Sequence, residues 1–171
     1  MKIKLNQIFS SGETEKTFNH VFNISPDDFK KFLIKEFKPC NLEVKFYSIN
    51  DKIFMDLKYK VDVVYQCARC LVDVNDTIEQ DFSKEIVVSN NEEAIENDTT
   101  LYVENNEIDI EEILLKSLYL NLEPSVLCDE NCKGLCPKCG TNLNDSKCDC
   151  DLNDIDPRFE KLKGLKDKLN D

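Results

Sequence analysis

Hydrophobic and polar residues alternate over much of the first hundred residues, which is the pattern of β-strands that bury one face. Stretches with this pattern lie at 2–9, 15–24, 42–49, 53–65, 71–88 and 101–103. Ser11-Gly12 separates the first two stretches as a turn. Asn50-Asp51 separates the third and fourth, and this pair predicts a tight turn in a long antiparallel hairpin.

The period changes to that of a helix in two places. The first expected helix begins at Ser25, a typical N-cap followed by Pro26, and ends at Pro39. The second begins at Asp109 and ends at Pro124. The apolar faces are formed by Phe29, Phe32, Leu33 and Phe37 in the first helix and by Ile113, Leu114 and Leu118 in the second.

Two further segments carry weaker signals. Residues 89–100 are polar and acidic, so we expect an exposed loop there. Residues 156–169 place Phe159, Leu162 and Leu165 at helical spacing, and this tail could form a short helix.

These elements predict an α+β fold: a curved antiparallel sheet or partial β-barrel with two helices and a C-terminal cysteine-rich zinc-binding segment. The 171 residues suit one domain with a small appendage. We place the α+β core, with the first cysteine pair, in residues 1–123. The cysteine-rich segment and tail, residues 124–171, would pack on that core.

Charge limits the partners that this chain can bind. Its net charge is −12, whereas a protein that binds RNA directly normally presents a basic face to the phosphates. Two zinc ions would add four positive charges but require eight thiolates, which makes the balance more negative. The acidity therefore favours a basic protein as partner.

Neither a secretory signal nor a membrane segment is expected. The first residues lead into no apolar run, and no run approaches the roughly 20 residues of a membrane helix. We therefore expect a cytoplasmic protein that does not contact membranes. In that reducing compartment, clustered cysteines indicate metal ligands rather than disulfides.

Eight of the nine cysteines lie in two islands, at residues 67–70 and 128–150, with spacings typical of metal sites. Closely spaced pairs deliver two thiolates from one turn, and zinc takes four in a tetrahedron. The closely spaced cysteines of residues 136–150 predict one site, formed by Cys136, Cys139, Cys148 and Cys150. The four remaining cysteines of the islands would form a second site: Cys67, Cys70, Cys128 and Cys132. Cys40 stands alone and is interpreted as a small buried hydrophobic residue.

Other uses of the thiols remain open. Cys67 and Cys70 could form a redox dithiol with Arg69 lowering a thiol pKa, although strand residues flank the pair on both sides. Four thiolates could also hold an iron–sulfur cluster, although the spacings differ from ferredoxin runs. His20 is the single histidine, and no phosphate loop or nucleophile elbow occurs, so no catalytic residue is proposed.

The cysteine islands resemble those of the YceD family, which is called YlbN in some bacteria. The matching stretches are Cys67-Ala68-Arg69-Cys70-Leu71, the run from Leu127 to Asn144, Cys148-Asp149-Cys150 and Asp156-Pro157-Arg158. The resemblance implies a bacterial cytoplasmic protein without enzymatic activity that supports accumulation of 23S rRNA. Genes of this family often neighbour one for a large-subunit ribosomal protein.

Resemblance and charge together predict a ribosome-biogenesis factor, an acidic adaptor for a large-subunit ribosomal protein or precursor particle. One alternative is direct binding of single-stranded rRNA through zinc knuckles. Its basic patch would consist of Arg69, Lys133, Lys138 and Lys147. The other alternative is a thiol oxidoreductase that uses Cys67 and Cys70.

Overall fold

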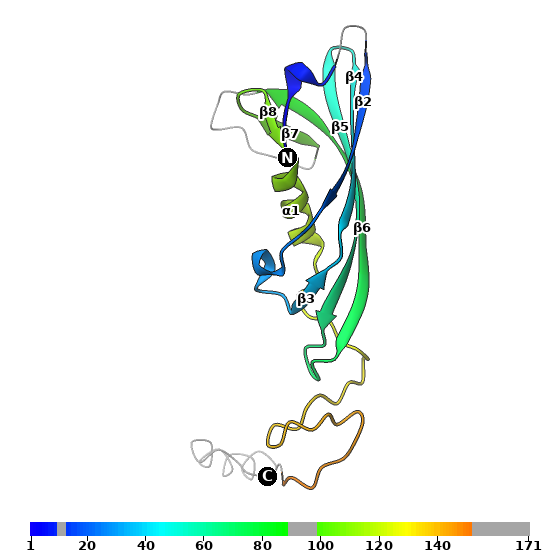
Figure 1. Ribbon diagram of the computed structural model, residues 1–171, viewed down its shortest axis with the longest axis vertical. Helices are drawn as coiled ribbons and strands as arrows, with labels where there is room; N and C mark the ends of the chain where they lie inside the picture. The colour runs from blue at the N-terminus through cyan, green and yellow to red at the C-terminus, as the bar shows by residue number, and fades with distance from the viewer. Residues whose placement is uncertain (10–12, 89–98, 152–171) are drawn as a thin grey trace, which may run out of the picture.

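A computed structural model describes residues 1–9, 13–88 and 99–151 of the chain. The strands are β1 (Lys2–Lys4), β2 (Glu15–Phe22), β3 (Ile34–Phe37), β4 (Cys40–Ile49), β5 (Lys52–Gln66), β6 (Asp73–Val88), β7 (Thr100–Val103) and β8 (Glu107–Asp109). The helical elements are the 3-10 turns η1 (Leu5–Gln7) and η2 (Pro26–Phe29) and the α-helix α1 (Ile110–Asn121). The larger sheet, of six strands, curves around α1 (Figure 1).

The hairpin of β4 and β5 is the centre of this sheet. Asn50 and Asp51 both adopt left-handed backbone conformations, with φ of 51° and 63°, as a tight hairpin turn requires. β2 pairs with the outer side of β4, and β6 pairs with β5 along almost its whole length. These pairs are antiparallel, and β7 then joins β6 in parallel. The expected curved sheet is confirmed, with one parallel edge strand added.

The expected helix at residues 25–39 is wrong. Its start is right, because the Ser25 Oγ accepts a hydrogen bond from the Asp27 N–H at 3.3 Å, but only the turn η2 follows. The chain then extends as β3 and pairs with β5. β4 covers β5 only as far as Lys60, so the remaining edge of β5 would be unpaired without β3. Pro39 has no N–H for the ladder and separates β3 from β4.

Other expectations are met in part. The strand at 2–9 ends at Lys4, and β1 pairs with β8 in a second, two-stranded sheet that the sequence pattern does not predict. The strands at 15–24, 71–88 and 101–103 correspond to β2, β6 and β7. Residues 10–12, 89–98 and 152–171 lie outside the described residues. These include the expected turn at Ser11-Gly12, most of the expected loop at 89–100 and the whole expected tail helix at 156–169.

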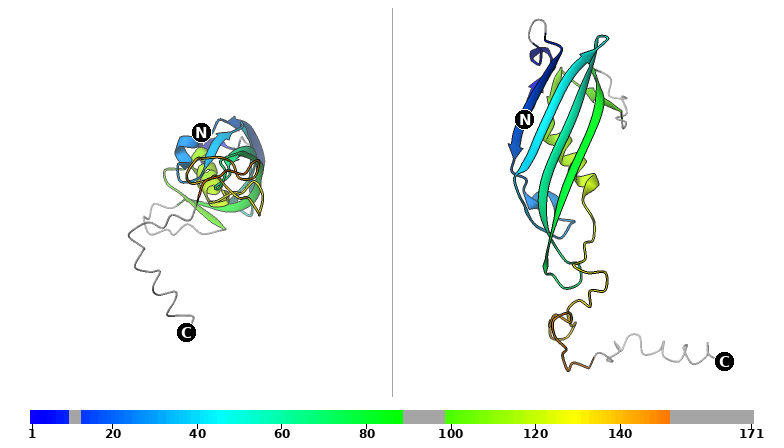
Figure 2. Two further views of the ribbon diagram at one scale, coloured as in Figure 1. Left: turned by 90° about the horizontal axis from the view of Figure 1, so that it is seen from below. Right: turned by 90° about the vertical axis from the view of Figure 1, so that its right-hand side faces the viewer.

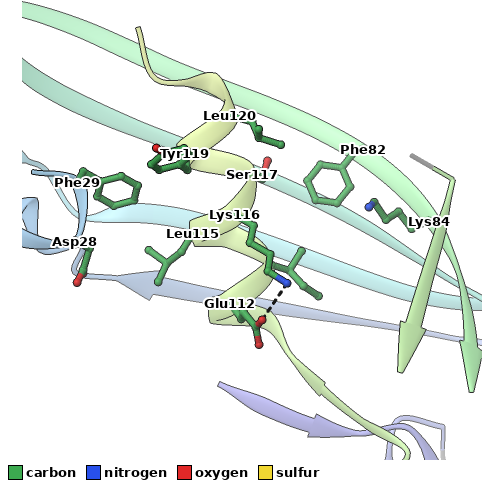
Figure 3. A pocket seen from close by; sticks show the side chains of 11 residues that line it. Asp28, Phe29, Phe82, Lys84, Glu112, Leu115, Lys116, Ser117, Tyr119 and Leu120 are labelled. Atoms are coloured by element: carbon green, nitrogen blue, oxygen red, sulfur yellow. Dashed lines mark ion pairs between the residues drawn. The ribbon is translucent and has the colours of Figure 1, made fainter. Parts of the chain in front are cut away.

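α1 lies in the hollow of the sheet and begins as expected. The Asp109 carboxylate accepts a hydrogen bond from the Glu111 N–H at 3.1 Å and caps the helix. Its outward side borders a groove between η2 on one side and β6 on the other, where Phe29 and Phe82 lie (Figure 3). Within the described residues, no helix is long and apolar enough to cross a membrane.

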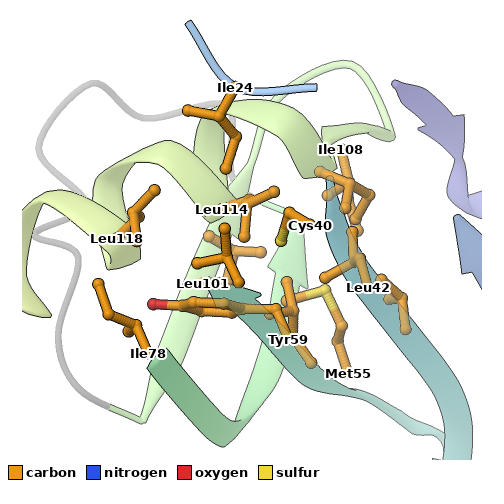
Figure 4. Close-up of a cluster of buried hydrophobic side chains, with 14 of the residues drawn as sticks. Ile24, Cys40, Leu42, Met55, Tyr59, Ile78, Leu101, Ile108, Leu114 and Leu118 are labelled. Carbon is orange, nitrogen blue, oxygen red and sulfur yellow. The ribbon is translucent and has the colours of Figure 1, made fainter. Parts of the chain in front are cut away.

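The main core fills the space between α1 and the concave face of the sheet (Figure 4). Leu114 and Leu118 of the helix pack there with side chains of β4, β5, β6 and β7. The Tyr59 hydroxyl shares a hydrogen bond with Ser117 Oγ at 3.2 Å and ties β5 to α1. Cys40 is fully buried in this core, and burial raises its pKa to about 11, as suits a small hydrophobic residue.

The ends of β5 and β6 project beyond α1 and carry the first cysteine pair in the turn between them. The chain leaves α1, returns to this turn and continues as the cysteine-rich segment at the far end of the molecule (Figures 1 and 2). The division into 1–123 and 124–171 stays a prediction.

Candidate metal centres

The turn between β5 and β6 is shaped to present two sulfur atoms. Cys67 N–H donates to the Val72 carbonyl at 2.8 Å, and Leu71 N–H donates to the Cys67 carbonyl at 2.9 Å. Leu71 takes a left-handed conformation, with φ of 61°, which reverses the chain into β6. The long antiparallel pairing of the two strands therefore holds Cys67 and Cys70 on one tight turn.

The sulfur atoms of Cys67, Cys70, Cys128 and Cys132 form one group, in which all lie within 4.8 Å of one another. Cys67 Sγ lies 3.7 Å from Cys132 Sγ, and Cys70 Sγ lies 3.4 Å from Cys128 Sγ. Tetrahedral zinc with Zn–S bonds of about 2.3 Å sets its sulfurs about 3.8 Å apart. A disulfide would need about 2.05 Å, and all nine cysteines are free. The donor set and spacing fit one zinc ion.

The second group comprises Cys136, Cys139, Cys148 and Cys150, whose sulfurs also lie within 4.8 Å of one another. Its first pair sits on a tight turn closed by Gly140 N–H donating to the Cys136 carbonyl at 2.8 Å. Cys136 N–H donates to the Thr141 carbonyl at 2.8 Å and continues the turn. Cys136 is the one buried cysteine of this group, whereas three of the four cysteines in the first group are buried, so the second group lies nearer the surface.

Hydrogen bonds favour thiolates in both groups. Burial raises the pKa of Cys67, but N–H groups of Cys128, Cys70 and Arg69 outweigh it and lower this pKa to about 6. In the second group the Thr141 hydroxyl, 3.1 Å from Cys139 Sγ, leads the interactions that lower the pKa of Cys139 to about 6.

The pKa values of other thiols in the same groups are raised instead. The neighbouring Cys70 sulfur is the main cause that raises the pKa of Cys128 to about 12, and Cys139 does the same for Cys150. Four thiolates so close together repel one another unless a cation lies between them. The chemistry of both groups therefore suits a divalent metal ion with four deprotonated ligands.

Backbone contacts fix the cysteine-rich segment to the turn between β5 and β6. Ala68 N–H donates to the Val126 carbonyl at 2.9 Å, and Leu135 N–H donates to the Arg69 carbonyl at 3.2 Å. The Arg69 guanidinium donates to the Cys132 carbonyl at 2.9 Å. Gly134 makes this approach possible, because a Cβ there would lie 3.1 Å from the Arg69 carbonyl oxygen.

Asn144 links the two groups and was not identified from the cysteine spacing. Its side-chain oxygen accepts from Lys133 N–H at 2.8 Å, and its amide donates to Cys132 Sγ at 3.3 Å. The same amide donates to Asn142 Oδ1 at 2.9 Å, and Asn142 lies beside the second group in a bridge with Leu135. Asparagine is common in turns and loops, so its presence at position 144 gives no signal in the sequence. Only the folded arrangement reveals this role.

Four sulfur ligands complete the tetrahedron of a zinc ion and leave no position for water or substrate. Such a site stabilises structure rather than catalysing a reaction. The cysteine-rich segment would gain order from such a site, because among the described residues its buried apolar contacts are few. The small cluster there consists of Cys67, Cys70 and Cys132 with Val74, Leu127 and Leu135 packed against it.

Comparison with known proteins places this arrangement in a family. A family model described as "Large ribosomal RNA subunit accumulation protein YceD" matches residues 55–166, which include all eight clustered cysteines. No solved structure matches the chain.

Several curated proteins are similar to the chain. The chloroplastic YCED homolog 1 of Arabidopsis thaliana is 38% identical over 63 residues, which is 37% of this chain and 20% of that protein. An uncharacterized protein of Mycobacterium tuberculosis is 29% identical over 124 residues, 71% of this chain and 59% of its own length. The uncharacterized protein YlbN of Bacillus subtilis is 26% identical over 133 residues, 77% of either chain.

This chain thus spans a fifth of the Arabidopsis relative and about three fifths of the mycobacterial one. The family match nevertheless covers most of the hairpin of β5 and β6, all of α1 and both cysteine groups. On this match, the chain belongs to the YceD family of large ribosomal RNA subunit accumulation proteins.

Proposed function

We propose that this protein is a non-enzymatic ribosome-biogenesis factor of the cytoplasm that supports accumulation of 23S rRNA. The family match carries this proposal, because the family is described as one of large ribosomal RNA subunit accumulation proteins. The two groups of four sulfurs support it, since a closed thiolate site has no open coordination position for catalysis.

The proposed mode of action is that of an acidic adaptor. With a net charge of −12, the chain attracts basic proteins and is repelled by RNA phosphates. It would hold or shield a basic large-subunit protein, or bind a precursor particle through such a protein. Each cysteine group would hold one structural zinc ion and keep the C-terminal segment in place on the hairpin of β5 and β6.

Depletion and pull-down together test this function. Loss of the protein should lower the ratio of 23S to 16S rRNA, and the tagged full chain should recover large-subunit proteins or precursor particles. A normal rRNA ratio combined with recovery of neither would contradict the proposal.

Direct binding of rRNA is the second candidate, because Lys133, Lys138 and Lys147 are exposed around the cysteine groups. The Arg69 guanidinium contributes less, since it already donates to the Cys132 carbonyl. Binding of single-stranded rRNA fragments across a salt series separates the two modes. Contacts to phosphates predict affinity that falls steeply with salt, whereas the adaptor predicts no measurable affinity at physiological salt.

A thiol oxidoreductase that uses Cys67 and Cys70 is the third candidate. The burial of Cys67 and its position among four sulfurs favour the structural role instead. Rapid alkylation of Cys67 or Cys70 in the folded, metal-loaded protein would favour the enzyme.

A further inference from the structure

Within the part of the chain that the structure describes, one long edge of the sheet carries no neighbouring strand. β6 has 16 residues, and β7 pairs only with Glu85–Val88 at its end. Residues 73–84 therefore have β5 on one side and, among the described residues, no strand on the other. The right-hand view of Figure 2 shows β6 as the outer strand over most of its length. Such an edge presents N–H and C=O groups that can pair with another chain.

An apolar groove runs beside this edge. It has a volume of about 890 Å³ and lies over the outward side of α1. Phe82 borders it from β6, and Leu115 and Leu120 border it from the helix (Figure 3). Leu120 is 82% exposed. A helix with apolar residues on nearly every side normally packs on more than one surface, and the sheet covers only one side of α1.

The two faces of β6 differ in chemistry at this edge. Residues directly opposite each other in paired strands point to the same face, and Phe82 lies opposite the buried Leu57. Phe82 therefore points to the concave face, where the groove lies. Glu79 and Asp81 alternate with it and are exposed on the convex face.

We propose that β6 binds an extended protein segment with alternating apolar and basic side chains, which adds as a strand beside residues 79–83. Its backbone would pair with the free edge of β6. Its apolar side chains would enter the groove beside Phe82 and Leu120, and its basic side chains would lie next to Glu79 and Asp81. This inference rests on the proposed function, because it identifies where the acidic adaptor binds its basic partner.

Charge selects this occupant over a second copy of the chain. β6 carries Asp73, Asp76, Glu79, Asp81 and Glu85 against a single lysine, Lys84, and lysines of β3 and β5 form ion pairs with the first, third and fifth of these acids. Two such edges side by side would place like charges opposite each other, which destabilises the pair. Acidic residues on an edge strand prevent self-association and still admit a basic strand.

A synthetic peptide of ten residues, alternating lysine with valine, is the direct probe. We expect it to bind the zinc-loaded full chain, as measured by fluorescence anisotropy. Bound peptide should slow amide hydrogen exchange at residues 79–83 but not along β2, which is the opposite edge. A peptide with glutamate in place of lysine should not bind.

Substitutions at the edge locate the site. Glu79→Lys with Asp81→Lys should weaken peptide binding about tenfold, because two attractive cross-strand pairs become repulsive. Glu15→Lys with Glu43→Lys is the matched control: both glutamates are exposed, and the change in net charge is the same, but they lie on β2 and β4. The control pair should change the affinity less than twofold. Leu120→Ser should also weaken binding, since it removes an apolar wall of the groove.

Several results would overturn the inference. These are equal loss of affinity in the two double variants, slowed exchange along β2 instead of β6, and a dimer that protects β6 without peptide. Absence of peptide binding alongside pull-down of large-subunit proteins would refute this site and leave the proposed function intact. Failure of the pull-down with specific peptide binding at β6 would support the site and count against the ribosomal role.

Discussion

At the scale of single residues, the positions of the ligands follow from the sequence, but the groups that support them do not. Paired cysteines separated by two or three residues predict sulfurs on tight turns, and the structure gathers the eight sulfur atoms into two groups of four. Asn144 has no such signal, although its amide contacts Cys132 Sγ at 3.3 Å. Binding of metal by either group stays a prediction.

Asn144→Ala should weaken zinc binding at the first group. The substitution removes an N–H donor to Cys132 Sγ and the acceptor for Lys133 N–H. Loss of such a supporting contact typically costs about 10–100-fold in metal affinity. Competition with a chromophoric chelator measures the change. Asn131→Ala is the control, because the backbone N–H of Asn131, rather than its side chain, bonds Asp129. Equal affinities of the two variants would contradict the role of Asn144.

Two glycines with similar backbone conformations should respond differently to substitution. Gly134 and Gly140 have φ of 75° and 73°, so alanine at either position costs about 1 kcal/mol in backbone strain. Alanine at Gly134 would in addition press its Cβ against the Arg69 carbonyl oxygen, whereas Gly140 has open space around it. Gly134→Ala should therefore reduce zinc retention more than Gly140→Ala under the same chelator challenge. The reverse order would show that the contact with Arg69 does not matter.

At the scale of elements, local patterns predict most strands and α1 but fail where pairing between distant segments decides. The Ser25 N-cap and the spacing of Phe29, Phe32 and Leu33 indicate a helix, and only one turn forms. Residues 34–37 instead form β3, which pairs with the edge of β5 that β4 leaves uncovered beyond Lys60. The local sequence around residues 25–39 cannot show that pairing with β5 outweighs the helix, because β5 lies about 30 residues further along the chain.

The two sides of α1 should differ sharply in their contribution to stability. Leu118 is fully buried against the sheet, so Leu118→Ala should lower the free energy of unfolding by about 2–5 kcal/mol. Leu120 is 82% exposed, and Leu120→Ala should change it by no more than about 0.5 kcal/mol. Urea denaturation of the zinc-loaded chain measures both. A loss of similar size in the two variants would mean that α1 is packed differently.

At the scale of the whole molecule, the chain has two kinds of interior. The sheet and α1 enclose an apolar core that contains Tyr59, Met55 and Leu118. As far as residue 151, where the described chain ends, the cysteine-rich segment has only a small cluster around Cys67, Cys70 and Cys132, so its order would depend on metal. The sheet and helix should therefore keep their fold without the ions.

Exhaustive chelation should release the cysteine-rich segment first. Amide exchange at residues 128–150 should become fast, while exchange in β4 and β5 stays slow because the apolar core is intact. The same buffer without chelator provides the control. Unchanged exchange at 128–150 after complete removal of metal would contradict a structural role for the ions.

Native mass spectrometry of the intact protein tests the central claim most directly. The account predicts a mass increase of two zinc ions less two protons for each ion, because at a given charge state each Zn²⁺ takes the place of two protons. It predicts one remaining ion in Cys70→Ser and one in Cys139→Ser, because these residues lie in different groups. A protein purified without chelators that carries no metal, or that loses both ions through either single substitution, would contradict two independent four-cysteine sites.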